Sequence, residues 1–199
     1  MMTTSCPVEK PDHGCDRKPY RLSVLICTMP SRATMLHNLK AYLVQQSNGY
    51  DVEILSDGDR GTIGAKRQRL LEASTGDYVA FIDDDDDINP QYIKLIFDNL
   101  GADVIGFEGE ITTNGRNKKR FTISKEHPYE EKNGIYYRYN NHLSPIRRSI
   151  AIQIGYKDMN FGEDFDYAMR LKESGLIKTE KYIYSPMYFY RYRTVRKSY

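Results

Sequence analysis

Residues 78–87 read YVAFIDDDDD, a short apolar run that passes directly into five consecutive aspartates. The aromatic and β-branched residues of the run predict a buried strand, so Asp83 begins at the edge of a sheet. Adjacent carboxylates repel one another unless a cation neutralises them or they point into water. Because hard oxygen ligands suit Mg²⁺ or Mn²⁺, which completes its shell with water and substrate phosphate, we predict a metal site for a phosphorylated ligand. A solvated acidic turn is the alternative interpretation.

Strands and helices alternate around this stretch. Apolar residues at helical spacing follow the first strand, and Ser31 is placed to cap that helix. The predicted elements are the strands 22–27, 52–55 and 78–82 and the helices 35–44, 63–73 and one ending at Leu100. Such alternation predicts an α/β fold with a mostly parallel central sheet flanked by helices, which binds ligands at the carboxyl ends of its strands.

The second half of the chain has a different pattern. We predict β-hairpins across residues 104–139, a helix over 164–173 that ends near Gly175, and terminal strands at 182–184 and 187–192. The Pro-containing residues 1–20 read as a flexible leader. The remaining residues, 21–199, form one predicted domain with a ligand-binding half, 21–100, and a small β-rich half, 101–199.

Composition indicates a globular protein, with 40% hydrophobic and 28% charged residues. No apolar run approaches the ~20 residues that span a bilayer, so we predict no transmembrane segment and a cytoplasmic location. Basic residues concentrate at 116–120 and 191–197, where they could contact phosphate. Cys6, His13 and Cys15 lack a fourth ligand at zinc spacing, and we predict neither a zinc site nor a disulfide framework.

A second group of acids lies in residues 161–171, which read FGEDFDYAMRL. Acids at a helix start can simply cap free N–H groups, which accounts for Asp164 or Asp166 alone. Together with the upstream aspartates, however, they supply a separate carboxylate that could remove a proton from a hydroxyl group. Residues 64–69, GAKRQR, read as a solvated basic helix face, except that Arg67 falls on the side of the aspartates and could meet a diphosphate or a base.

The order of these motifs resembles glycosyltransferase family two, the large inverting group with the GT-A fold. The similarity extends over about residues 22–198. It rests on the opening strand with Thr28 and Arg32, on the turn ILSDG at 54–58 and on the helix at 64–69. Residues 75–86 are similar to its D-x-D stretch, with Asp83 and Asp85 as the first and last acids of that motif.

The resemblance implies a metal-dependent inverting glycosyltransferase that uses a nucleotide-diphospho-sugar donor, for which we expect a UDP-sugar. Asp57 would bind the base, Asp83 the ribose side, and Asp85, with Asp83, the Mn²⁺ or Mg²⁺ ion, while Asp86 would support them. The expected nucleotide-binding residues are Thr28, Arg32, Asp57, Arg67, Asp83 and Asp84. In the same way, Asp164 is the expected general base, beside Glu163.

The resemblance also bears on the acceptor, which would be a hydroxyl group of a glycan or, through the basic C-terminal residues, of nucleic acid. His142 and Arg148 precede the second acidic group, where family members shape the acceptor pocket. We expect either residue to contact the acceptor or a phosphate, or to be purely structural. Arg193 stands where many members have a histidine, and is a third candidate for a phosphate contact.

Two other functions fit parts of the pattern. A phosphatase of the haloacid dehalogenase type also has D-x-D after an apolar strand, with the first aspartate as nucleophile. That family expects threonine or valine where this chain has Asp87. A nucleotide-sugar or calcium-binding module without catalysis is the second alternative, and Glu163 with Asp164 argues against it.

Overall fold

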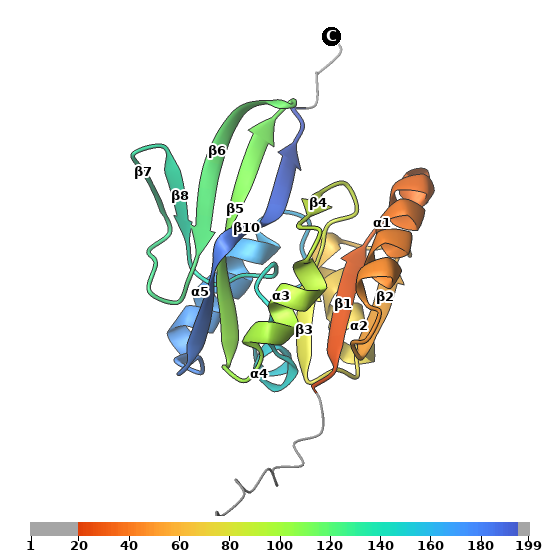
Figure 1. The fold of residues 1–199 in the computed structure, drawn as a ribbon, viewed down its shortest axis with the longest axis horizontal. Helices are drawn as coiled ribbons and strands as arrows, with labels where there is room; N and C mark the ends of the chain where they lie inside the picture. The colour runs from red at the N-terminus through yellow and green to blue at the C-terminus, as the bar shows by residue number, and fades with distance from the viewer. Residues whose placement is uncertain (1–19, 195–199) are drawn as a thin grey trace, which may run out of the picture.

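A computed structural model describes residues 20–194 (Figure 1). Its first half contains three parallel strands in the order β2 (Val52–Asp57), β1 (Leu22–Cys27) and β3 (Tyr78–Phe81). The helices of this half are α1 (Ala33–Gln46), α2 (Ile63–Ala73) and α3 (Tyr92–Asn99). The predicted alternation of strands and helices is therefore confirmed, and all three strands end at the same edge of the sheet.

Two local predictions in this half are wrong. Ser31 does not cap α1, because Pro30 starts a short 3-10 turn, η1 (Pro30–Arg32), and Arg32 occupies the N-cap without a side-chain cap bond. Proline has a fixed φ suited to a first helical turn, which moves the start of the helical segment upstream of Ser31. The short strand β4 (Asp87–Ile88) was not predicted, since it forms only by pairing with a distant strand.

The second half is β-rich, as predicted. Strand β5 (Val104–Thr113) forms an antiparallel hairpin with β6 (Arg116–Ile123), and β7 (Glu130–Lys132) forms another with β8 (Ile135–Arg138). Asn-Gly pairs with positive φ occupy both turns, the geometry that suits two-residue hairpin loops. Strand β9 (Ile146–Arg147), α4 (Arg148–Ile154) and α5 (Glu163–Ser174) follow, and α5 ends at Gly175 as predicted.

The two predicted terminal strands are one strand, β10 (Glu180–Tyr192). It pairs in parallel with β5 along its length and antiparallel with β4, with register shifts around Pro186. Proline has no N–H to donate, so the strand is irregular there without ending. The complete sheet is consequently mixed, and the expected parallel pairing dominates only its first half.

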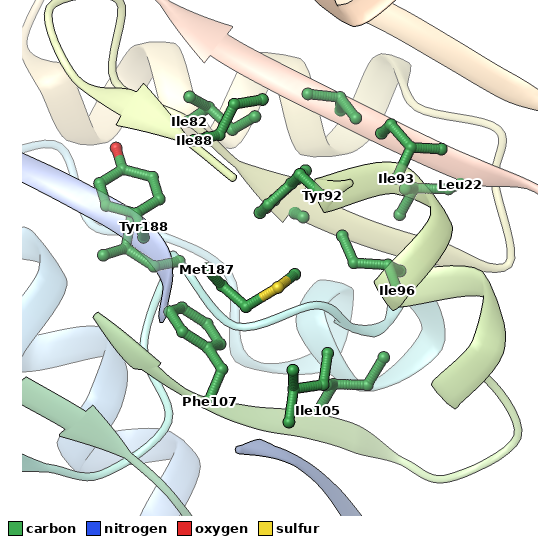
Figure 2. Close-up of a cluster of buried hydrophobic side chains, with 14 of the residues drawn as sticks. Leu22, Ile82, Ile88, Tyr92, Ile93, Ile96, Ile105, Phe107, Met187 and Tyr188 are labelled. Atoms are coloured by element: carbon green, nitrogen blue, oxygen red, sulfur yellow. The ribbon is translucent and has the colours of Figure 1, made fainter. Parts of the chain in front are cut away.

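Two hydrophobic clusters cover the faces of the sheet. Successive residues of β1 alternate between them: Val24 and Ile26 face the first cluster, Leu25 and Cys27 the second. Figure 2 shows part of the first cluster, where Ile96 of α3 lies toward Met187 of β10 and Ile93 lies beside Leu22 of β1. Strand β10 therefore shares a core with the helix that follows the aspartates.

Residues 1–19 of the predicted leader, with Cys6, His13 and Cys15, lie outside the described residues, whereas Tyr20 packs edge-on against Tyr78 and so belongs to the folded domain. Cys27 is a free, buried cysteine, and burial raises the pKa of its thiol to about 12. Among residues 20–194, no helix is long and apolar enough to cross a membrane.

Candidate active site

Buried and more exposed side chains alternate along the five aspartates. Asp84 and Asp86 are buried, whereas Asp83 and Asp85 are partly exposed and Asp87 is exposed. Asp84 accepts hydrogen bonds from Thr28 Oγ1 at 2.5 Å and from Arg32 Nη1 at 2.7 Å. It thereby connects the loop after β3 to the loop after β1.

Asp86 is held from the opposite side by β10. It accepts hydrogen bonds from the Tyr188 hydroxyl at 2.9 Å and from the Arg191 backbone N–H at 2.7 Å. Burial raises the pKa of Asp86 to about 7, and the charges of Asp83 and Asp85 add to the rise. The same Tyr188 hydroxyl accepts a hydrogen bond from the Asp83 backbone N–H at 3.0 Å. Strand β10 thus fixes the backbone of residues 83–87, which we call the acidic loop.

Arginine side chains of the protein neutralise most of the charge repulsion among the five aspartates. Arg32 pairs with Asp84 and also with Asp85, at 3.0 Å from Asp85 Oδ2, while Arg67 pairs with Asp83 and Arg191 with Asp87. The sequence argument named Arg32 and Arg67 as nucleotide-binding residues, but it considered only a metal or water as the partner of the aspartates and did not predict these ion pairs. The three arginines come from three separate segments, so no local pattern around the aspartates identifies them.

Arg67 lies at the centre of the site. Its side chain is 3% exposed, with Nη2 at 3.2 Å from Asp83 Oδ1 and Nε at 3.4 Å from Glu163 Oε1. Its guanidinium also lies over the Phe81 ring. Burial alone would raise the pKa of Asp83, but Arg67 and His142 together outweigh burial, with the Arg67 charge as the largest lowering effect, and hold that pKa far below its usual range. One buried cation thus joins the acidic loop to the start of α5.

A pocket of about 600 Å³ opens on this arrangement, and we call it the Asp164 pocket. Arg67, Asp83, His142 and Asp164 all contribute to its lining. Three buried nitrogens of its lining have no hydrogen-bond partner among the described residues: Arg67 Nη1 and both ring nitrogens of His142. His142 Nε2 lies 3.7 Å from Asp83 Oδ2. Buried polar atoms are nearly always satisfied, so these point to a ligand with hydroxyl or similar groups.

The acids at the start of α5 differ in their surroundings. Asp166 is paired with Lys157 at 2.5 Å and with Arg170 at 2.7 Å, which gives it a structural role. Asp164 is half-buried and lines the pocket, where it could accept a proton. Glu163 is buried against Arg67, so it orients the guanidinium and contributes to the pocket wall.

Helix α2 is fastened to the segment that precedes Asp164. Gly64 N–H donates to Met159 O at 3.1 Å, and Thr62 Oγ1 to Asp158 at 2.5 Å. A Cβ atom on Gly64 would lie 1.9 Å from Lys157 O, closer than atoms can approach. The close contact positions Arg67, on the next turn of α2, beside Glu163.

Asp57 lies at the carboxyl end of β2, beside Thr28. Arg69 Nε donates to Asp57 Oδ2 at 2.7 Å, and Lys66 Nζ donates to Thr28 O at 2.6 Å. Burial would raise the pKa of Asp57, but the hydrogen bond from Arg69 leads the contacts that lower it. Lys66 was interpreted as part of a solvated helix face and is in fact buried.

Two further candidates take different positions. Arg148 Nε donates to Ser74 Oγ at 2.9 Å, and its backbone N–H to Asp77 O, at the amino end of β3. Because Asp83 follows the carboxyl end of β3, the expectation that Arg148 contributes to the site is wrong. Arg193 is exposed and lines a pocket of about 500 Å³ with Asp84–Ile88 and the exposed face of α1, which we call the Asp85 pocket.

The carboxylates suit a divalent cation with an incomplete protein shell. The described residues contain no group of three or more His, Cys, Asp or Glu side chains arranged to hold a metal ion. Asp83 and Asp85 nevertheless present partly exposed carboxylates, with side-chain exposures of 26% and 25%. Mg²⁺ commonly binds through one or two carboxylates together with water and substrate phosphate, so the residues fit such an ion.

Much of this site falls within a region that is similar to a known family. The sequence profile described as Glycosyl transferase family 2 matches residues 23–159, which include the acidic loop, α2 and His142. No curated protein sequence is significantly similar to the chain.

Solved structures share the fold. The crystal structure of Staphylococcus aureus TarS 1-349 matches with a TM-score of 0.57 and 18% identity, over 86% of this chain and 60% of TarS 1-349. Its complex with UDP-GlcNAc matches with a TM-score of 0.58 and 16% identity, over 90% of this chain and 61% of that one. This chain therefore spans about three fifths of the length of these relatives.

Proposed function

This chain belongs to glycosyl transferase family 2, and from that membership we propose that it transfers a sugar from a UDP-sugar to a hydroxyl acceptor, with inversion at the anomeric carbon. One observation carries the proposal: Arg67 joins Asp83 at 3.2 Å to Glu163 at 3.4 Å, next to Asp164. A donor-binding loop and a general base must act on the same carbon atom, and this ion-pair chain holds the two segments together.

The donor nucleotide is proposed to lie at the carboxyl ends of β1 and β2. Asp57 and Thr28 meet there, and Arg32 extends from the next turn toward Asp85. Asp84 supports this surface from beneath, because its carboxylate is 1% exposed and fully occupied by Thr28 and Arg32. The TarS structures solved with UDP and with UDP-GlcNAc favour uracil as the base.

The transferred sugar is proposed to enter the Asp164 pocket. Arg67 Nη1 and the ring nitrogens of His142 would then find hydroxyl partners in the sugar, with Asp83 between them. This assignment moves Arg67 from the base or diphosphate, where the sequence suggested it, to the sugar. Satisfying a buried donor recovers the desolvation penalty of leaving it unpaired, about 1–3 kcal/mol.

In the proposed reaction, Asp164 accepts the proton of the acceptor hydroxyl. The hydroxyl oxygen forms a bond to the anomeric carbon while the bond from that carbon to the diphosphate oxygen breaks, on the opposite face of the sugar. General-base catalysis of this kind contributes about 10²–10⁴-fold. Asp83 and Asp85 would hold Mn²⁺ or Mg²⁺, which supplies positive charge to the departing diphosphate.

Family membership disfavours the two alternatives drawn from the sequence. The first aspartate of a phosphatase must be free to attack phosphorus, whereas Asp83 is committed to Arg67 and lies beside His142. A binding module without catalysis needs no carboxylate in the Asp164 pocket. Release of phosphate from simple phosphomonoesters would favour the phosphatase over our proposal.

The test is thermal stabilisation by nucleotides. At a concentration of 100 times Kd, UDP should stabilise the protein by about 2.7 kcal/mol, which for this size corresponds to about 5–10 °C in Tm. The shift should require Mn²⁺, exceed that given by GDP or dTDP, and be largely lost in Asp85→Ala even with Mn²⁺ present. An equal response to every nucleotide, or none with metal present, would contradict the proposed donor.

A further inference from the structure

Aromatic side chains form much of the wall of the Asp164 pocket. The aromatic residues that line it include Tyr129, Tyr136, Phe161, Tyr190 and Tyr192. Phe161 is the most exposed of them, at 89%, and it directly precedes the Gly162-Glu163-Asp164 segment. Large exposed apolar side chains clustered at a pocket usually mark a binding surface.

The aromatic wall is held in place by contacts within the protein. The Tyr129 ring packs edge-on against Phe165 of α5, with ring centroids 4.9 Å apart. Arg138 lies over the Tyr129 ring at 4.2 Å and over the Tyr136 ring at 4.9 Å. Its Nη1 group donates to two backbone carbonyls, Glu130 O and Tyr137 O, so this guanidinium supports the wall.

The charges of the pocket do not favour an anionic acceptor. Its Arg, Lys, Asp and Glu lining residues are two arginines, Arg67 and Arg138, and three carboxylates, Asp83, Glu163 and Asp164. Arg67 is paired with two of these carboxylates. A phosphate group entering here would meet the unpaired carboxylate of Asp164 and only one cation that is not already paired.

The basic strand β6 does not change this balance. Lys118 pairs with Glu110, Lys119 with Glu131 and Arg120 with Glu108, each within 2.7 Å. The basic run at residues 116–120 is therefore largely neutralised by neighbouring strands. It does not form the continuous positive surface by which proteins track nucleic acid.

We propose that the acceptor is an uncharged pyranoside whose apolar ring face stacks on Phe161 and whose hydroxyl group points to Asp164. The inference rests on the proposed function, because Asp164 is taken as the base. A pyranose ring offers C–H groups on one face and hydroxyls around its edge. An exposed aromatic ring beside a carboxylate matches both properties, and a rigid ring face is what distinguishes this ligand from other polyols.

The direct test is ligand-observed saturation-transfer NMR on the full chain in the presence of UDP and the diamagnetic ion Mg²⁺. The probes are methyl β-D-glucopyranoside, methyl β-D-galactopyranoside, the open-chain polyol sorbitol and glucose 6-phosphate. We expect at least one methyl pyranoside to bind through its ring protons, and sorbitol and the phosphate to bind more weakly. Equal or tighter binding of sorbitol or glucose 6-phosphate, or displacement of the pyranoside by an oligothymidylate, would overturn the proposal.

Variants then test the role of Phe161. Phe161→Ala should weaken pyranoside binding about tenfold, equivalent to about 1.4 kcal/mol, while Phe161→Tyr keeps the ring and restores binding. Tyr184→Ala is the matched control, because Tyr184 is 85% exposed but lines a different pocket. That pocket includes Thr122 of β6, whereas the Asp164 pocket includes Ile123, and successive residues of a strand point to opposite faces. Unchanged binding in Phe161→Ala, or an equal loss in Tyr184→Ala, would contradict stacking at this site.

Stabilisation by UDP separates the two failures. If UDP stabilises the protein but no pyranoside binds, the acceptor inference is wrong and the proposed donor stands. If pyranosides bind in a Phe161-dependent way without any nucleotide response, the donor proposal is wrong and the pocket recognises sugar in another reaction.

Discussion

At the scale of single residues, Asp164 and Asp166 show how neighbours on one helix acquire different roles. Asp166 is held by Lys157 and Arg170, whereas Asp164 lines the pocket that also contains Asp83. Both acids lie in the first turn of α5, so both benefit from the helix dipole. A pair within the helix to Arg170 and a tertiary contact with Lys157 therefore separate the structural acid from the candidate base.

Asp164→Asn should abolish transfer and leave the fold intact. The amide has the same shape but cannot accept the acceptor's proton at neutral pH, so we expect transfer to fall about 10²–10⁴-fold. A coupled assay of UDP release in the presence of acceptor measures the loss, and stabilisation by UDP should persist. Asp166→Asn is the matched control and should retain transfer. Wild-type turnover in Asp164→Asn would exclude this residue as the base.

The candidate residues illustrate what the sequence could reveal. Asp83, Asp164 and Arg67 lie in local sequence patterns that follow a strand, open a helix or belong to one, and in the structure all three line the Asp164 pocket. Tyr188 was not foreseen, although it bonds both Asp83 and Asp86, because a buried tyrosine in an apolar strand looks like any core residue. Arg148 lies away from the site because the pairing of β9 with β3, which the sequence does not show, places it at the amino end of β3.

At the scale of elements, the contact between α2 and the segment before α5 carries the geometry of the site. The two backbones meet at Gly64, whose N–H bonds Met159 O and whose Cα leaves no room for a side chain. Glycine inside a helix costs about 1 kcal/mol relative to alanine. Its presence here trades helix stability for a close approach.

Gly64→Ala tests whether the close backbone contact outweighs the gain in helix propensity. Higher helix propensity would favour alanine by about 1 kcal/mol, but its Cβ would lie 1.9 Å from a backbone carbonyl that cannot rotate away. We expect the overpacking to dominate and lower the free energy of unfolding by about 1–3 kcal/mol, seen as a lower midpoint in urea. Transfer should fall as well, since Arg67 and Glu163 would shift apart. An unchanged midpoint would show that the backbones do not pack this closely.

Strand β10 shows where element prediction reached its limit. Its sequence contains Ser185-Pro186 between two apolar runs, which predicted two strands, yet one strand continues through the irregularity because β5 pairs with it on both sides. Strands 22–27 and 78–82 and helix 63–73 were predicted nearly to the residue because each has a strong local period. Pairing partners distant in sequence leave no such period.

At the scale of the whole molecule, Asp103 connects the two ends of the β-rich half. Its carboxylate accepts the backbone N–H groups of Lys178 and Thr179, just before β10, and lies 3.4 Å from Arg147. Burial would raise the pKa of Asp103, but these backbone hydrogen bonds outweigh burial and lower it. The charged form therefore stabilises the fold.

The sign of this shift predicts acid sensitivity. A lowered pKa contributes stability that is present above the unfolded value, about 3.9, and is lost as pH falls through the folded value. Asp103→Asn should therefore be about 1 kcal/mol less stable than wild type at pH 7, with the difference shrinking below about pH 4. Urea unfolding at several pH values measures it, with the exposed Asp98→Asn as control. A difference independent of pH would contradict the role of the charge.

The alternation in the acidic loop has a consequence for how this stretch can change. Exposure alternates along its five aspartates: the odd-numbered members are partly or fully exposed, and the even-numbered members are buried and bind Thr28, Arg32 and Tyr188. Deletion of one aspartate would leave an acidic stretch but shift its register by one residue, so that buried positions would become exposed and exposed positions buried. We therefore expect this loop to tolerate a substitution more readily than a deletion or an insertion.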